Sequence, residues 1–466
     1  MKLRMKIGAA IASAAILAPV ASTVAFAGTA IDGTGATFPA NMYDICAAQY
    51  NRSSLANPNK DTVAYVSPTG SGAGKTAFTA QTKVWAGTDS LYTSGAPSFS
   101  YVYVPLISGA ISVMYRLDGV TPAGSQVRLS PLTVGKIFAG QIKTWNDAAI
   151  VADNTATTTK AITKVTKKGV TVSAKKSGNK VVFTITGTAA ALKTYKGKMV
   201  KIARTTKSGT STTTTDVYNK ALTAKGTASL TYQKDATYAV KVGVTTLGSV
   251  SVDDTVSGVT LTLPATPIKV AYRASTSGTT NNFTNFLNKA VGSIWTTAAN
   301  DSFTTAFPGG SSAVPSDGTF QAATGSDGVA NYVKDNNGAI TYTETSFVEE
   351  RKTANIQSAA IKNNAGVYVA PSSKATSAFY AEATVNADGS VTPDYTVAAA
   401  DAYLINAISY GLGATAASTA NTAVASWFKY VLNSCAPASA ESAYYAPLAG
   451  NLLTKALAQA AKVGAS

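Results

Sequence analysis

The chain has 466 residues, of which 45% are hydrophobic and only 13% are charged, a composition that excludes an intrinsically disordered protein. This length predicts about three domains of ~150 residues each. Histidine is absent, which excludes nucleophilic sites with a histidine base and zinc sites with histidine ligands. The two cysteines are too few for a four-thiolate site, so we expect neither a metal nor another cofactor.

The positive charge is concentrated in two segments. The first 27 residues carry a net charge of +3, and residues 156–265 hold 16 Lys and one Arg against four Asp, a net charge of +13. Because the whole chain carries +16, the remainder is neutral. The sequence therefore describes a neutral protein with one strongly basic block.

Residues 1–27 have the pattern of an export signal. Three cations in the first six residues precede an apolar run that begins at Ile7 and ends at Ala25-Phe26-Ala27, which predicts cleavage before Gly28. An uncleaved anchor is the alternative, but Pro19 and many small residues make the segment weakly hydrophobic for that role. No lipoprotein cysteine follows, so we expect a soluble exported protein that is periplasmic, extracellular or associated with the cell surface.

Export permits a disulfide between Cys46 and Cys435, and two buried free thiols are the alternative. In the loop-entropy view, a bond between positions so far apart in the chain would stabilise the fold by roughly 4–5 kcal/mol at most.

Strand-like and helix-like patterns alternate in residues 28–152, which predicts an α/β fold. Helices are expected directly after Pro39 and over Leu132–Phe138. Strands are expected at Val63–Val66, Lys83–Ala86 and Ile107–Tyr115.

The pattern changes at about Asp153, where a Thr-rich linker leads into short runs with alternating apolar residues. Residues 154–265 predict an inserted all-β, sandwich-like domain. Ser177-Gly178-Asn179 is a hairpin signal between two of its strands. The expected strands are Val170–Val172, Val181–Ile185, Leu230–Tyr232, Tyr238–Val244 and Val259–Leu263.

The α/β pattern resumes after the insert. We expect a strand at Ile268–Tyr272 and a helix capped by Ser277, with Phe283 and Phe286 on its buried face. Ser326 is expected to cap a further helix, and the tail 418–466 is predicted to be helical.

Three loops could bind an anion. Gly33–Pro39 and the Ser-Gly loop Ser67–Thr76 each lead into a helix, and free N–H groups at a helix start favour negative charge. The second loop nearly matches a nucleotide P-loop, but Thr69 replaces a glycine of that motif, so a free oxyanion is the better candidate. In the third loop, Arg273–Thr280, a guanidinium stands beside hydroxyl groups and free amides.

A carboxylate, Asp89, ends the strand that begins at Lys83. Taken alone it is most simply an ordinary turn residue. Likewise, Arg273 alone could serve a surface ion pair beside an ordinary helix cap.

Together these segments resemble the phosphate-binding protein of the high-affinity phosphate ABC importer. That family has a Gly-Ala-Thr-Phe-Pro loop, a Gly-Ser loop, a Ser/Thr-Asp pair and an Arg…Ser-Gly-Thr turn, in this order. The resemblance continues in Lys136–Asp147, Ser326–Val329 and Gly338–Tyr342, and it covers about 325 residues, leaving out the signal and the insert.

The resemblance implies a two-lobed fold of the periplasmic-binding-protein type (type II), with hinge strands, that closes over one phosphate. One lobe would comprise 28–115 and 398–466, and the other 116–153 and 266–397. It also implies a non-enzymatic monomer that delivers phosphate to membrane permease subunits.

Site residues are carried over from the family position by position. Asp89 would be the acceptor, because phosphate keeps a proton near neutral pH and sulfate has none to give. The donors would be Thr37, Phe38, Ser71, Arg273, Ser277, Gly278 and Thr279.

The chain departs from the family in two places. Ser275 stands where the family often has an Asp that orients and partly neutralises the arginine, so we expect an extra positive charge in the cleft. The basic insert, 154–265, is the second departure. It could be a solvated decoration, or it could attach to an anionic surface such as a teichoic acid wall polymer or phospholipid headgroups. Nucleic acid is not expected, because the block shows no stacking pattern of aromatic residues.

Two other functions remain open from the sequence. A cell-surface or wall-associated adhesion module would use the basic insert, and its binding to cell walls would be weakened by salt. A phosphate-ester hydrolase would need turnover that depends on Asp89, without any histidine.

Overall fold

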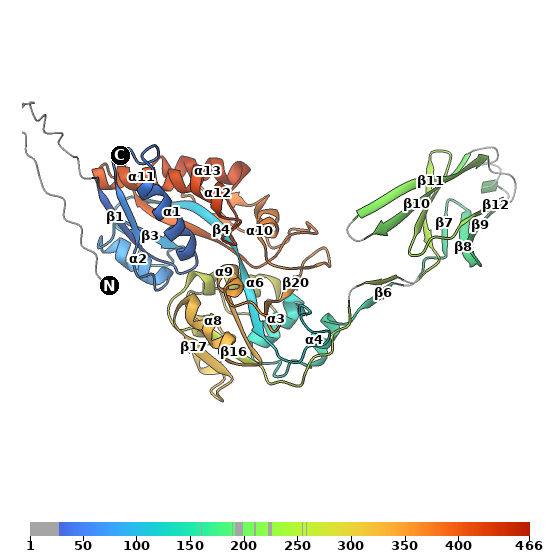
Figure 1. Cartoon of the computed structure of the whole chain (residues 1–466), viewed down its shortest axis with the longest axis horizontal. Helices are drawn as coiled ribbons and strands as arrows, with labels where there is room; N and C mark the ends of the chain where they lie inside the picture. Colours follow the sequence, from blue (N-terminus) through green and yellow to red (C-terminus); the bar gives the residue numbers. More distant parts are fainter. Residues whose placement is uncertain are drawn as a thin grey trace, which may run out of the picture.

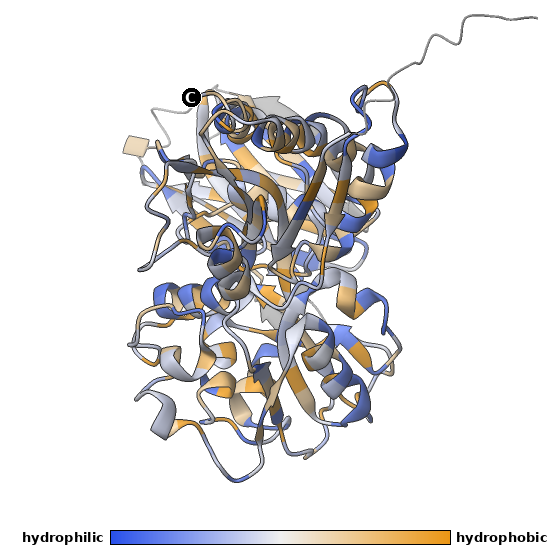
Figure 2. Cartoon of the chain, turned by 90° about the vertical axis from the view of Figure 1, so that its left-hand side faces the viewer, coloured by the Kyte–Doolittle hydropathy of each residue, from blue (hydrophilic) through white to orange (hydrophobic). Residues whose placement is uncertain are grey.

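The computed structural model describes residues 28–466 except 160, 189, 192–198, 209–210, 222–225, 254 and 258. The predicted signal segment, residues 1–27, lies outside this part of the chain. Figure 1 shows a two-lobed body and a separate β domain that projects from it on two strands. Viewed from the side opposite the insert, the two lobes lie one above the other (Figure 2).

One nine-stranded sheet runs through both lobes in the order β17-β16-β18-β4-β24-β3-β1-β2, with β19 (Ile356–Ser358) paired to β4. In the first lobe, β1, β2 and β3 are parallel and β24 is antiparallel to them. The strands of this lobe are β1 (Ala30–Gly35), β2 (Thr62–Tyr65), β3 (Trp85–Thr88) and β24 (Asn406–Ala414).

The helices of the first lobe include three from the C-terminal tail. They are α1 (Ala40–Arg52), α2 (Ser71–Thr79), α11 (Thr419–Tyr430), α12 (Ala436–Ser439) and α13 (Gly450–Ala460). A disulfide joins Cys46 of α1 to Cys435, so the tail is bonded covalently to the start of the same lobe. The predicted disulfide is therefore confirmed.

The second lobe repeats the parallel arrangement around β16, which pairs with β17 and β18. Its principal elements are α3 (Pro131–Phe138), α4 (Ala148–Asp153), β16 (Lys269–Arg273), α6 (Gly278–Ala290), α7 (Phe303–Ala306), β17 (Phe320–Ala323), α8 (Gly325–Asp335), β18 (Ala339–Glu344) and α9 (Thr345–Glu349). The helix α10 (Ser373–Tyr380) lies instead beside β24, where Thr376 donates to Asn406.

A single long strand, β4 (Tyr101–Arg116), connects the lobes. Its first part pairs with β24 and its last residues pair with β18. Because all but its end residues are buried, it reads in the sequence as a continuous apolar run rather than an alternation. The predicted lobe boundaries near residues 115 and 397 stay a prediction.

The insert has its own core, with Phe183 packed edge-on against Tyr238. Two antiparallel sheets enclose it, in the orders β11-β10-β13-β14 and β12-β9-β8-β7. Their strands are β7 (Lys164–Lys167), β8 (Val170–Ser177), β9 (Lys180–Gly187), β10 (Met199–Ser208), β11 (Ser211–Ala221), β12 (Gly226–Thr231), β13 (Thr237–Val242) and β14 (Thr245–Ser251). The sandwich and its Ser177–Lys180 hairpin are as predicted.

The predicted linker is in part a strand. β6 (Thr157–Thr159) pairs with β15 (Thr255–Ser257), and we call this pair the stalk of the insert. The strand predicted at Val259–Leu263 is wrong, since Thr262 makes only an isolated bridge to Thr121. Its apolar alternation reflects Leu261 and Leu263, which are buried against the core of the body.

Candidate functional site

The candidate site lies where the parallel strands of both lobes end. β1, β2 and β3 end there from one lobe, and β16, β17 and β18 from the other, and α1, α2, α6 and α8 begin beside them. In α/β sheets, ligands bind at the carboxyl ends of strands. The first turns of four helices supply N–H groups without helical partners, which favour an anion.

Arg273 ends β16 and lies deep in the site, with 2% of its surface exposed. Its Nη1 donates to Ser326 Oγ at 3.2 Å, while Nε and Nη2 have no partner among the described residues. Burial lowers the pKa of Arg273, and the nearby Glu344 carboxylate opposes this shift. Buried guanidinium donors without partners are rare, so this side chain is poised to bind a carboxylate or an oxyanion.

Asp89 follows β3 on the other lobe and is also buried. Its Oδ1 accepts a hydrogen bond of 2.7 Å from Ser409 of β24. Burial raises the pKa of Asp89 to about 8; the Ser409 bond opposes this and the Glu344 charge adds to it. At neutral pH this carboxyl group therefore holds a proton that it can share with a ligand.

Ser71, at the start of α2, links the two lobes. Its Oγ accepts from the backbone N–H of Asp89 at 3.0 Å and from that of Gly278 at 3.1 Å. Gly278 has to be glycine, because a Cβ there would lie 2.4 Å from Ser71 Oγ and 2.6 Å from Asp89 Cβ. The lobes therefore touch directly at this point, and the structure is closed.

The remaining predicted donors surround the same position. Ser277 is the N-cap of α6 and accepts from Thr280 N–H, as predicted. Thr279 donates to Glu344 at 3.4 Å. Thr37 lies before α1 and hydrogen bonds Ser326 of the opposite lobe at 2.9 Å. Phe38 is buried, and its carbonyl accepts from Tyr445 at 2.6 Å.

Ser326 and Glu344 belong to this network but were not among the predicted site residues. Ser326 Oγ donates to Glu344 Oε1 at 2.8 Å, and Glu344 is buried at the end of β18. Ser326 was predicted as a helix cap, which is wrong: Gly325 begins α8 and Thr324 is its N-cap. A carboxylate directly after a buried strand, as at Asp89, is the signal that could have identified Glu344.

Ser275 contacts the opposite lobe, and the excess of positive charge predicted from it stays a prediction. Its Oγ donates to the carbonyl of Thr69 at 3.0 Å, at the edge of the site. The second buried carboxylate is instead Glu344, so two carboxyl groups and one guanidinium share the interior.

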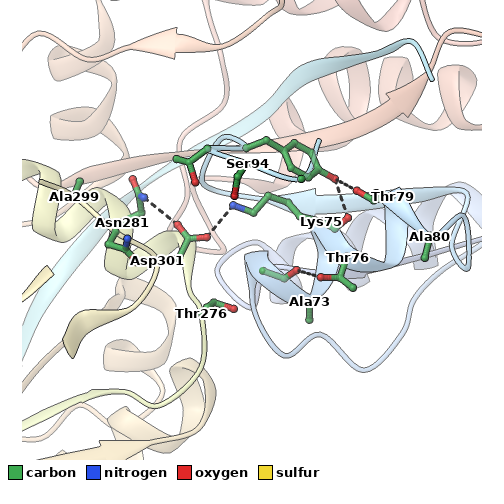
Figure 3. A pocket seen from close by; sticks show the side chains of 15 residues that line it. Ala73, Lys75, Thr76, Thr79, Ala80, Ser94, Thr276, Asn281, Ala299 and Asp301 are labelled. Atoms are coloured by element: carbon green, nitrogen blue, oxygen red, sulfur yellow. Dashed lines mark hydrogen bonds and ion pairs between the residues drawn. The ribbon is translucent and has the colours of Figure 1, made fainter. Parts of the chain in front are cut away.

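Lys75, the lysine of the near P-loop motif, lies outside this interior. Its Nζ forms an ion pair of 2.9 Å with Asp301 of the other lobe and donates to Ser90 Oγ at 3.1 Å. Figure 3 shows Lys75 reaching across to Asp301 in a groove of about 800 Å³ between the lobes. This ion pair joins the closed lobes from outside the site.

Two further features concern only the part of the chain that the structure describes. Within it, no three His, Cys, Asp or Glu side chains are grouped so as to hold a metal ion. Nor does that part contain a helix long and apolar enough to cross a membrane.

Comparison with known proteins places the fold in a family. The model of the PBP superfamily domain matches residues 20–158 and 148–434. The chain is 33% identical over 135 residues to the phosphate-binding protein PstS of Xylella fastidiosa, a match covering 29% of this chain and 32% of the relative. It is 37% identical over 100 residues to PstS 3 of Mycobacterium leprae, covering 21% and 24%. The chain thus spans about a third or less of these curated relatives.

Among solved structures, a phosphate-binding protein from Stenotrophomonas maltophilia has a TM-score of 0.47 at 16% identity, covering 92% of this chain and 93% of the other. A putative phosphate ABC transporter substrate-binding protein with bound phosphate, from Clostridium perfringens, has the same TM-score at 9% identity, covering 90% and 100%. The family match extends over most of the chain and includes both lobes. The protein is therefore a member of the PBP superfamily, a family of substrate-binding proteins rather than enzymes.

Proposed function

We propose that the protein captures inorganic phosphate between its two lobes and delivers it to the permease subunits of an ABC importer. One observation carries the proposal: Arg273 is buried with two guanidinium nitrogens, Nε and Nη2, unpartnered among the described residues, in a cleft whose opposite wall carries Asp89. A tetrahedral oxyanion satisfies these donors and the N–H groups of the surrounding helix starts. The relatives named as phosphate-binding proteins support the same ligand.

The selectivity for phosphate over sulfate comes from the protons that phosphate and Asp89 carry. Near neutral pH both phosphate and Asp89 carry protons that they can share, and Asp89 has a pKa of about 8 through burial. Sulfate brings no proton, so the hydrogen bond depends on the proton of Asp89 alone. Above pH 8 that carboxylate ionises and repels sulfate, while hydrogen phosphate still donates to it.

The proposed ligand set consists of the predicted residues together with Ser326. Arg273 donates hydrogen bonds to the anion, Asp89 shares a proton with it, and hydroxyl or backbone N–H groups provide the remaining contacts. The residues proposed to bind phosphate are Thr37, Phe38, Ser71, Asp89, Arg273, Ser277, Gly278, Thr279 and Ser326. Glu344 accepts hydrogen bonds from two of these hydroxyl groups, those of Thr279 and Ser326, and we assign it no direct contact with the anion.

Calorimetric titration of the mature chain, residues 28–466, stripped of bound anion, tests the proposal. We expect tight one-to-one binding of phosphate and, at slightly alkaline pH, no competition from sulfate. Equal affinity for both anions would contradict the proton-based selectivity. Absence of binding by either anion would contradict the proposal itself.

A further inference from the structure

The distal end of the insert, opposite the stalk, carries an unbalanced positive charge. Ser251 N–H donates to Ile162 at the stalk, so the β13–β14 turn lies at the other end of β14. The β7–β8 turn lies there too, since β7 runs away from the stalk and a Cβ on Gly248 would lie 3.3 Å from Val165. The exposed lysines of this distal end are Lys167, Lys168, Lys201 and Lys241.

Two of these lysines face each other directly. Lys201 of β10 and Lys241 of β13 are partners in the antiparallel register, where side chains lie close enough for like charges to destabilise a sheet. The same row continues to Asn219 on one side and Thr246 on the other. No carboxylate therefore stands in this row to relieve the repulsion.

The acidic residues of the insert lie elsewhere. Asp253 accepts from Tyr232 and from Asp235 N–H beyond the stalk end of β14. Asp216 is opposite Ala203, midway along β10. Among the described residues of the insert, no lysine forms an ion pair with a carboxylate. The charge of the distal end is therefore available to a partner.

Exposed apolar side chains accompany these lysines. Val244 occupies the turn between β13 and β14 with its whole surface exposed, at 101%. A two-residue hairpin turn favours Gly, Asn or Asp rather than a β-branched residue. Met199 is 39% exposed and its carbonyl accepts from the adjacent Gly243 N–H. The distal end thus combines an apolar tip with surrounding cations.

We propose that the distal end of the insert docks on an anionic phospholipid surface, with the lysines at the headgroups and Val244 and Met199 at the acyl boundary. Lysines near an anionic leaflet and apolar side chains that enter it both favour binding. A soluble polyanion such as a wall polymer or nucleic acid would use the lysines but gain nothing from an exposed valine. The Val244 tip therefore favours the lipid surface over the polymer.

Flotation of the mature chain with lipid vesicles tests this proposal. We expect binding to phosphatidylcholine vesicles that contain phosphatidylglycerol, weakened by salt, and none to phosphatidylcholine alone. Lys201→Gln with Lys241→Gln should weaken binding about 30-fold at low salt. The matched control is Lys429→Gln with Lys455→Gln, which removes the same charge from α11 and α13 of the body and should change nothing.

The apolar tip has a separate readout. Val244→Ser should weaken vesicle binding about tenfold, whereas Val259→Ser, at an exposed valine beyond the stalk, should not. Phosphate affinity and thermal unfolding verify that each variant is folded, and Lys201→Arg with Lys241→Arg should retain binding. Absence of binding to the anionic vesicles overturns the proposal. The proposal is also overturned if Val244→Ser leaves vesicle binding unchanged and a soluble polyphosphate binds equally tightly. That result would assign the surface to a polyanion.

Discussion

The closed cleft and the basic insert both present cations, but in opposite surroundings. In the cleft, Arg273 is buried beside two carboxyl groups, and its partner Ser326 is held by hydrogen bonds to Glu344 of the same lobe and Thr37 of the other. In the insert, Lys201 and Lys241 are exposed and have no acidic partner among the described residues. A buried, directional site selects one ion and is screened little by salt, whereas exposed charge attracts any polyanion and is screened strongly. The cleft and the insert are therefore expected to differ in how selectively they bind anions.

The largest effect is expected at Arg273. Arg273→Gln should weaken phosphate binding on the order of 10³-fold, because it leaves a buried anion without its only guanidinium partner. Calorimetry of the mature variant measures the loss. Arg52→Gln, at an exposed position in the last turn of α1, should bind normally. Near-normal phosphate binding by Arg273→Gln would show that the cleft does not depend on its buried guanidinium, and would contradict the contrast drawn between the cleft and the insert.

Asp89→Asn should lower the preference for phosphate over sulfate by about 10²-fold. In the native protein this preference should increase as pH rises through about 8, since burial raises the pKa of Asp89 to about 8. Titrations with both anions on either side of that pH measure the change. The variant should show no such increase, and Asp44→Asn, on an exposed face of α1, should behave as the native protein.

The same group affects stability. The pKa of Asp89 is higher in the folded protein than its ordinary value of 3.8, so the native state retains a proton that the unfolded state loses between these values. Stability of the anion-free protein should therefore decrease as pH rises from about 4 to about 8. Thermal unfolding across this range should show a smaller decrease for Asp89→Asn, and an equal decrease would assign the effect to other groups.

Glu344→Gln should strengthen the binding of doubly charged anions about tenfold, because it removes a buried negative charge beside Arg273. Sulfate, or phosphate at alkaline pH, is the ligand to titrate. Glu349→Gln, at a carboxylate paired with Lys352 on the surface, is the control. Uniformly weaker binding of all anions would show instead that Glu344 acts by holding the Ser326 and Thr279 hydroxyl groups.

The smallest effect is expected at the Lys75–Asp301 ion pair, which joins the two lobes outside the anion site. Lys75→Gln or Asp301→Asn should weaken phosphate binding only a few-fold, because the pair lies in the groove outside the proposed anion site and acts only on closure of the lobes. A double-mutant cycle by calorimetry isolates the pair. Coupling as large as the effect of Arg273 would mean that closure, rather than contact with the anion, provides most of the affinity.

The cleft was predicted from its loops because glycines, hydroxyl groups and one arginine each follow a strand, and strand ends converge in this fold. Glu344 was not predicted because the segment that resembles the family, Gly338–Tyr342, ends two residues before the end of β18. The prediction for Ser326 is wrong because Gly325, with φ of +69°, lets the helix begin two residues earlier than it would after a Ser326 cap. A local sequence pattern predicts a strand and the loop after it. It does not predict the hydrogen bond between Thr37 and Ser326, which are 289 residues apart in the sequence and meet only in the folded structure.

In the insert, alternation predicted β8, β9, β12 and β13 but not β7, β10, β11 or β14, and only the β8–β9 hairpin was predicted as a pairing. β3 of the body likewise begins at Trp85, two residues later than the predicted strand, because element ends depend on the neighbours with which they pair. The opposition of Lys201 and Lys241 follows from register alone, since 40 residues of chain separate them. Charge composition therefore identifies a basic domain, whereas only pairing shows which lysines are concentrated at one end.

Diffraction from crystals of the mature protein grown with arsenate tests the central claim most directly, because arsenate has the shape and protonation of phosphate and an anomalous signal that locates it. We expect one arsenate inside the closed cleft, within hydrogen-bond distance of Arg273 Nη2 and Asp89. Arsenate found instead beside Lys75, or on the lysines of the insert with the cleft unoccupied, would contradict it.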